Sequence, residues 1–227
     1  GMDWTESLDQ YCERLDASFW AEPLNAVTNA AFLVAAALAL RIWLQRAPRD
    51  WSALALIGVV TATGIGSFLF HTYANRWSML ADVIPIAIFI HLYLFLALRR
   101  FVGAGAVVAG GTTALFLVAS PFIGRLAAPL VGSSAGYLPA LAAIFVVGAL
   151  CLGRSRDTAL GLVATGVLFT LSLTFRTLDG PVCSALPFGT HFLWHVCNAG
   201  VLFLLMWLYM RAAAAGAAGK THGAATA

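Results

Sequence analysis

The sequence predicts an all-α membrane protein, a seven-transmembrane helix bundle. Of its 227 residues, 61% are apolar and only 10% are charged, whereas soluble domains average about 45–50% apolar and about 25% charged residues. Stretches of about 20 mostly apolar residues, long enough to cross a bilayer, recur along the chain. A single soluble core cannot hide so much apolar surface, so most of the chain is expected to lie in lipid.

Seven apolar stretches are expected to form the membrane spans. The connections between them are short, so consecutive helices should run antiparallel within one domain. The predicted spans are residues 24–44, 52–71, 79–98, 101–122, 137–153, 158–175 and 190–210.

Two polar segments flank the predicted membrane domain, residues 24–211. Residues 1–23 are polar and acidic and lack a basic stretch followed by an apolar core, so no cleaved signal peptide is expected there. Residues 212–227 are an Ala/Gly run that contains Lys220 and His222. That run is too featureless to pack, and we expect it to be a disordered tail.

The chain contains a single lysine and has a net charge of +3 without a basic patch, which excludes nucleic-acid binding.

Arginine and lysine indicate the orientation, because cytoplasmic loops of membrane proteins carry an excess of both. We expect the N-terminus outside and the C-terminus in the cytoplasm. One side holds Arg41, Arg46, Arg49, Arg99, Arg100, Arg154, Arg156, Arg211 and Lys220, and the other holds Arg14, Arg76, Arg125 and Arg176.

The four cysteines divide by their expected surroundings. Cys12 and Cys183 both fall on the predicted outer side, an oxidising compartment in which disulfides form. Their separation does not follow from the sequence, so a disulfide and two unpaired thiols are both open. Cys151 and Cys197 fall inside spans and are interpreted as packing residues.

Five polar side chains within the predicted spans are the strongest functional candidates, because such groups are costly in lipid and mark function by default. His191 and His195 are four residues apart, which places both imidazoles on one helix face, as two ligands of one metal require. Ser67 and His71 have the same spacing. Together with Asp82, these residues are expected at similar depth in the outer half of the membrane.

This group predicts a catalytic zinc (Zn²⁺) site. Three neutral imidazoles leave one position open on the metal, which lowers the pKa of a bound water toward about 7. Asp82 is expected to be the base or a carboxylate that supports a ligand, and Ser67 a donor to the developing oxyanion. The alternative is that each histidine only hydrogen-bonds to a neighbouring helix. His91, deeper in the membrane, is expected to be a packed or helix-bridging histidine.

Carboxylates cluster just before the first predicted span. Several carboxylates on a short, irregular segment suit a hard cation such as calcium (Ca²⁺). From spacing alone, a solvated acidic entry to a helix is the preferred interpretation. Arg176 and Asp179, in the last outer loop, are interpreted as a surface ion pair, with a lipid headgroup as the alternative contact. The acidic residues are Asp9, Glu13, Asp16 and Glu22.

Four short motifs are specific when taken together. They are YCER at 11–14, FWAEPLNAVTN at 19–29, GIGSFLFH at 64–71 with Asp82 following eleven residues later, and THFLWH at 190–195. With these motifs the chain resembles the alkaline ceramidase family, within the larger superfamily of seven-span hydrolases that includes adiponectin receptors. The resemblance covers nearly the whole membrane part.

The resemblance implies cleavage of the amide bond of ceramide to a sphingoid base and a fatty acid. It further implies that His71, His191 and His195 ligate zinc, that Ser67 supports the oxyanion and that Asp82 moves protons. It pairs Cys12 with Cys183 and turns the interpretation of the acidic segment toward a regulatory calcium ion. The spacing of Asp9, Glu13 and Asp16 departs from the animal pattern, whereas Glu22 matches through its Ala-Glu-Pro context.

The expected partner is a membrane lipid that enters sideways from the outer leaflet, and no protein partner can be inferred. Another N-acyl lipid or an ester would suit the same chemistry. A receptor of the adiponectin type would share the zinc site, but the YCER and AEPLN segments argue against it. A retinal-binding pump is excluded because the only lysine is Lys220. A transporter would show broken helices with charges near the membrane midplane, whereas the polar residues here are expected in the outer half of the membrane.

Overall fold

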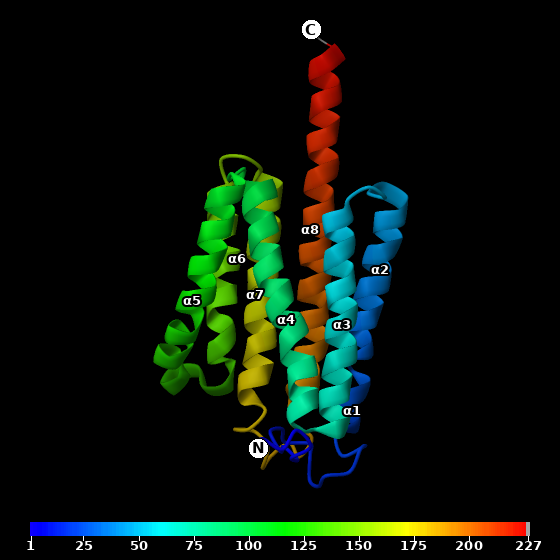
Figure 1. The fold of residues 1–227 in the computed structure, drawn as a ribbon, viewed down its shortest axis with the longest axis vertical. Helices are drawn as coiled ribbons and strands as arrows, with labels where there is room; N and C mark the ends of the chain where they lie inside the picture. The colour runs from blue at the N-terminus through cyan, green and yellow to red at the C-terminus, as the bar shows by residue number, and fades with distance from the viewer. Residues whose placement is uncertain (226–227) are drawn as a thin grey trace.

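In the computed structural model, which describes residues 1–225, long helices pack side by side along a common direction (Figure 1). The chain is all-α, as predicted. Its elements are α1 (Pro23–Val27), α2 (Ala30–Arg46), α3 (Trp51–Tyr73), α4 (Arg76–Ala97), the π-helical turn η1 (Leu98–Val102), α5 (Ala106–Val131), the 3-10 turn η2 (Gly132–Tyr137), α6 (Leu138–Cys151), α7 (Arg156–Leu178) and α8 (His191–Ala225).

Six helical stretches within residues 1–225 are long and apolar enough to cross a membrane. One of them, Ala106–Cys151, holds both α5 and α6, between which the chain turns back (Figure 1). α6 has only 14 residues, fewer than the roughly 20 that a bilayer core requires. The seven predicted spans nevertheless overlap α2 to α8 one for one.

Local hydrogen bonds explain where several helices begin. Asp50 accepts from the main-chain N–H of Ala53 at the start of α3, and Ser155 accepts from Thr158 at the start of α7. Asn75 and Ser78 form a reciprocal capping box at the start of α4. Only Ala74 and Asn75 separate α3 from α4, so the end of α3 lies beside the beginning of α4.

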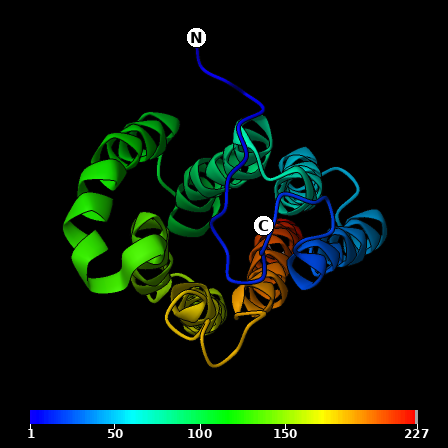
Figure 2. The same cartoon turned by 90° about the horizontal axis from the view of Figure 1, so that it is seen from below.

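The last helix, α8, packs between α2 and α7 and so completes the bundle. Figure 2 views it from the end that the N-terminal segment crosses and shows α8 packed against α2 and α7. Small residues on α2, among them Ala35, Ala36 and Ala39, are buried and let neighbouring helices approach. α3 and α4 approach closely where Gly66 meets the main chain of Ala81, which brings the following residues of the two helices, Ser67 and Asp82, to one level.

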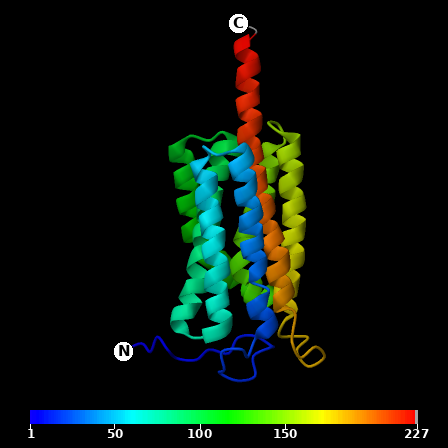
Figure 3. The ribbon, with the colours of Figure 1, turned by 90° about the vertical axis from the view of Figure 1, so that its right-hand side faces the viewer.

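The C-terminal part of α8 differs from the predicted disordered tail. The helix continues to Ala225 and projects beyond the other helices (Figure 3). Alanine has the highest intrinsic helix propensity, so an Ala-rich run extends a helix that already has a packed beginning. Residues 226 and 227 of the predicted tail lie outside the described residues.

The N-terminal segment, residues 1–22, crosses one end of the bundle and is called the strap below (Figures 2 and 3). The predicted disulfide is present between Cys12 and Cys183. The Leu8 N–H donates to the Ala74 carbonyl at 2.7 Å, and Arg76 forms an ion pair with Glu6. Cys151 and Cys197 are free cysteines inside helices.

Candidate metal centre

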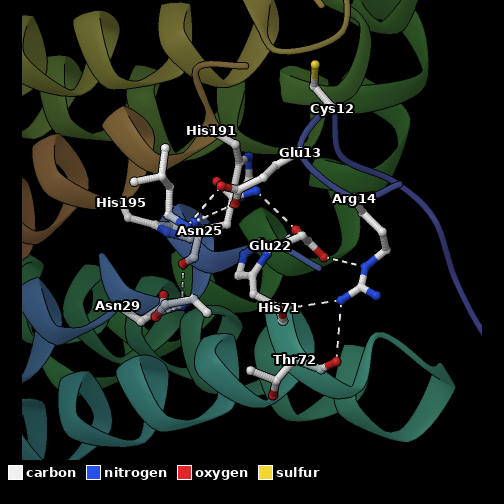
Figure 4. A network of polar contacts seen from close by, with 12 residues as sticks. Cys12, Glu13, Arg14, Glu22, Asn25, Asn29, His71, Thr72, His191 and His195 are labelled. Atoms are coloured by element: carbon white, nitrogen blue, oxygen red, sulfur yellow. Dashed lines mark hydrogen bonds and ion pairs between the residues drawn. The ribbon is translucent and has the colours of Figure 1, made fainter. Parts of the chain in front are cut away.

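His71, His191 and His195 meet at the end of the bundle that the strap covers (Figure 4). His71 comes from the last turn of α3, and the other two come from the first turns of α8. Each offers one ring nitrogen, and these nitrogens all lie within 4.8 Å of one another. All three side chains are buried. The sequence therefore predicted both the members of this cluster and their meeting.

The second nitrogens of two rings are held by hydrogen bonds. His71 Nδ1 lies 2.8 Å from Glu22 Oε1, and His195 Nδ1 lies 2.9 Å from Thr28 Oγ1. A carboxylate only accepts, and the Thr28 hydroxyl already donates to the Leu24 carbonyl at 2.7 Å. Both Nδ1 atoms are thus the donors, which leaves a lone pair on Nε2 of His71 and of His195 for a metal.

The donor set fits a metal ion. Carboxylates and hydroxyls that orient ligating histidines are the usual partners of such rings. His191 Nδ1 is buried and finds no hydrogen-bond partner among the described residues. Such a buried nitrogen requires a partner, and a metal ion held by the cluster would provide one. Three imidazoles suit zinc and several other transition metals. Among the side chains that the structure describes, this is the only cluster of three or more His, Cys, Asp or Glu residues placed to bind an ion.

A small polar cavity adjoins the histidines. Ser67, Asp82, His191 and His195 line it together, so the predicted hydroxyl and carboxylate reach the same space as the predicted ligands. Ser67 is buried and Asp82 is half-buried. These positions follow from the close approach of α3 and α4 at Gly66. A carboxylate and a hydroxyl thus lie beside the histidines.

Sequence reasoning missed Tyr11, which covers the histidines. Its ring centroid lies 4.0 Å from that of His191 and 4.8 Å from that of His71. Burial raises the pKa of the Tyr11 hydroxyl, so the ring is a neutral cover. Its signal was its place next to Cys12, whose disulfide fixes the strap.

Arg176 and Asp179 have separate roles in place of the predicted surface ion pair. Asp179 is buried and accepts main-chain N–H groups of Cys12, Thr190 and His191 at 3.0–3.1 Å. It therefore caps α8 and holds the strap. Arg176 lines the polar cavity with its guanidinium over the Tyr137 ring. His91 lies apart, edge-on to Phe116 of α5, which agrees with a packed residue.

The four predicted calcium ligands do not converge on one point. Asp9 and Asp16 are exposed, and Asp16 accepts from the Ser18 main chain at 2.8 Å. Glu13 accepts from the Leu24 and Asn25 main chain at 2.9 Å, because the first N–H groups of α1 need acceptors. Burial raises the pKa of Glu13 more than these bonds lower it.

Glu22 is the one of the four that hydrogen-bonds to a histidine, whereas Glu13 lies nearby and is held by α1 (Figure 4). Besides His71, Glu22 contacts Arg14, whose Nε lies 2.6 Å from Glu22 Oε2. Burial raises the pKa of Glu22, but the hydrogen bonds from His71, Asn25 and Arg14 hold it below its ordinary value. A guanidinium, not a set of carboxylates, therefore neutralises this buried carboxylate.

An apolar cavity continues from the polar one between α4, α6, α7 and α8. The two share Ile86, Tyr137 and Asn198 as walls. Along α4 the apolar cavity runs from Ile86 to Ala97, a distance of roughly 16 Å at about 1.5 Å per helical residue. The centre thus combines imidazoles, a carboxylate and a hydroxyl with a long apolar chamber.

No family model matches the sequence, and no curated protein matches it. The functional conclusion therefore depends on the motifs and on the geometry of this centre.

Proposed function

We propose that this chain is a zinc-dependent amidohydrolase that cleaves ceramide or a related N-acyl lipid to a free fatty acid and an amine. The observation that carries the proposal is the cluster of three buried imidazoles beside Asp82 and Ser67, at the mouth of an apolar cavity. The resemblance of the four sequence motifs to the alkaline ceramidase family supports the same reaction.

His71, His191 and His195 would hold the zinc ion, and Glu22 and Thr28 would keep two of these rings in the required tautomer. Bound zinc would supply Lewis acidity toward the substrate carbonyl and lower the pKa of a water molecule. Zinc fits because three buried histidine nitrogens within 4.8 Å of one another are a usual ligand set for it.

Asp82 and Ser67 would carry the proton and charge movements. The Asp82 carboxylate would accept a proton from the attacking water and deliver it to the amine nitrogen as the C–N bond breaks. The Ser67 hydroxyl would donate a hydrogen bond to the carbonyl oxygen as negative charge develops on it. One water molecule and one amide would thus yield one fatty acid and one amine.

The apolar cavity would hold the acyl chain of the lipid. It is lined by aromatic and aliphatic side chains, and its polar neighbour begins where the amide would lie. An N-acyl lipid has this order of groups, with a polar linkage at the end of a long apolar chain. A small water-soluble amide has no apolar chain to contact these side chains.

We also infer that α2 to α8 all cross the membrane with the metal centre toward the outside. The disulfide at the strap suits an oxidising outer compartment. Arg46, Arg100 and Arg156 lie at the other end of the bundle, where the positive-inside rule expects them.

Turnover by the purified protein tests the hydrolase. The zinc-loaded chain in detergent should release fatty acid from ceramide or another N-acyl lipid, and mass spectrometry of both products would identify the bond that is cut. An ester of the same acyl chain, offered in parallel, would reveal an esterase. His195→Ala and Asp82→Asn should lose turnover by at least about 100-fold, in the range of general acid–base contributions.

His91→Ala is the matched control, because His91 lies in a span but away from the centre. It should keep turnover near the wild-type value. Failure of the zinc-loaded wild-type protein to hydrolyse any N-acyl lipid, or full activity of Asp82→Asn, would reject the proposal.

A further inference from the structure

Arg14 is a buried cation beside the metal centre. Its side chain is only 2% exposed, although it belongs to the strap and not to the bundle. Buried arginines are rare unless all of their N–H groups have acceptors. In Figure 4 the guanidinium lies between Glu22 and the end of α3.

Five oxygens surround the guanidinium. Nε donates to Glu22 Oε2 at 2.6 Å. Nη1 donates to the carbonyls of Asp16 and Ser18 at 3.0 and 3.2 Å. Nη2 donates to the carbonyls of His71 and Thr72 at 3.3 and 3.4 Å. An arginine side chain has five N–H donors, so each N–H group has an oxygen to meet.

Two of these oxygens belong to the last turn of α3. The carbonyls of the last helical turn lack partners within the helix, and a cation there is favoured by the helix dipole. Arg14 therefore fixes the main chain of His71 directly. It links the strap to the helix that carries a predicted ligand.

The carboxylate of Glu22 extends this contact to the imidazole. One of its oxygens faces Arg14, and the other accepts from His71 Nδ1 at 2.8 Å and from Asn25 Nδ2 at 3.0 Å. The Glu22 side chain is 1% exposed. A carboxylate this deeply buried requires a compensating charge, which the guanidinium provides.

We propose that Arg14 is a positioning residue of the metal centre and its permanent internal cation. Arg14 orients His71 twice, through its main-chain carbonyl and through the Glu22 carboxylate that holds Nδ1. Its guanidinium also occupies the oxygen-lined space beside Glu22. Without it, a bound divalent cation would be needed there to neutralise the Glu22 carboxylate. This inference rests on the proposed use of the three histidines as metal ligands.

Zinc affinity tests the inference on the purified full chain in detergent. Competition with a chromophoric chelator gives the dissociation constant of Zn²⁺ for each variant. Arg14→Gln and Glu22→Gln should each weaken binding by about 10- to 100-fold, the usual effect of losing a partner of a ligating histidine. The double variant should lose less affinity than the sum of the two single losses, because Arg14 and Glu22 are in direct contact and share the route through His71 Nδ1.

Arg76→Gln is the matched control. It breaks the ion pair of Arg76 with Glu6, which also ties the strap to the bundle but does not touch the histidines. Zinc affinity of this variant should equal that of the wild type. Arg14→Lys retains a positive charge near Glu22 without the five-donor fork, so its affinity should fall between wild type and Arg14→Gln, and it decides the matter if Arg14→Gln does not fold.

Unchanged zinc affinity in Arg14→Gln would overturn the role of Arg14, and where that variant does not fold, unchanged affinity in Arg14→Lys would do so. Additive losses in the double variant would also overturn it. So would a loss of affinity in Arg76→Gln equal to that in Arg14→Gln. A wild-type protein that binds no zinc would overturn both this inference and the proposed function. A wild-type protein that binds zinc but hydrolyses no lipid would reject the hydrolase alone, since the variant affinities still decide the role of Arg14.

Discussion

Gly66 of α3 lies so close to α4 that a Cβ atom at this position would come within 1.7 Å of the Ala81 carbonyl oxygen. The contact is between main chains, so no side chain can rotate away to make room. The next residues on the two helices are Ser67 and Asp82, and both line the polar cavity. The spacing of the proposed proton acceptor and hydroxyl donor therefore depends on the absence of one methyl group.

Gly66→Ala should separate α3 from α4 and misplace Asp82 relative to the histidines. We expect a loss of stability of about 1–3 kcal/mol, as for other overpacked cores, and a loss of most lipid turnover. Gly58→Ala is the control, because a Cβ atom there meets nothing within 4 Å and Ala favours a helix. Thermal unfolding in detergent measures both variants, and equal melting temperatures would contradict the prediction.

Reduction of the Cys12–Cys183 disulfide should release the strap from the loop before α8. We expect a loss of roughly 2–4 kcal/mol, the usual range for removal of a disulfide. A reductant should therefore lower the melting temperature of the wild type but not that of Cys12→Ser, which is already lowered. Cys197→Ser should behave as the wild type does, because Cys197 is unpaired. If a reductant left the melting temperature of the wild type unchanged, the disulfide would have no stabilising role.

Replacement of the Tyr11 ring should open the metal centre. Tyr11→Ala removes the cover from His191 and His71, so zinc should be lost to an excess of chelator at least several-fold faster than from the wild type. Tyr11→Phe keeps the ring and should lose zinc at the wild-type rate. The release is followed by the absorbance of the chelator complex, and equal rates in Tyr11→Ala and Tyr11→Phe would argue against a cover.

The ion pair of Asp50 with Arg100 predicts an acid-sensitive contribution to stability. Burial raises the pKa of Asp50, but the bonds and charge of Arg100 outweigh it and hold the pKa below its ordinary value. A carboxyl with a lowered pKa stabilises the folded state fully above its unfolded pKa of about 3.9. That contribution is lost as the pH falls through the lower, folded pKa.

The difference in stability between wild type and Asp50→Asn should thus be on the order of 1 kcal/mol at neutral pH and should shrink below about pH 4. Asn still caps α3, so the comparison isolates the charge. Unfolding in detergent at a series of pH values measures it, and a difference that grows toward acid would contradict this assignment.

Calcium should not affect this protein. Arg14 already contacts the buried Glu22, and the side chains of Asp9 and Asp16 are exposed. Millimolar Ca²⁺ should leave the melting temperature and the zinc affinity of the wild type unchanged, with Mg²⁺ as the control for ionic strength. A saturable shift that Ca²⁺ produces and Mg²⁺ does not would favour the calcium site that the sequence resemblance implies.

The sequence was sufficient for the helices and for the histidine cluster. Long apolar runs and the spacing of His191 and His195 are local signals, and antiparallel packing then brings His71 to the same level. The strap was harder to predict because its path has no periodicity. Arg14 and Tyr11 both contact His71, which lies more than 50 positions further along the chain.

The acidic residues show the same difference. Glu13 accepts from the first N–H groups of α1, so a helix start competes with any ion for its oxygens. A sequence pattern counts carboxylates but does not reveal such competing donors. One signal for Arg14 was available: it is one of the few arginines on the side that the positive-inside rule leaves poor in positive charge.

The bond between Cys12 and Cys183 spans 171 positions of sequence and closes a covalent ring that contains every helix from α1 to α7. During synthesis the ring cannot close until the loop before α8 has emerged, so the strap is locked only after α1 to α7 have been made. Once closed, the ring survives one break: a protease that cuts any single loop inside it leaves two pieces that remain joined until the cystine is reduced.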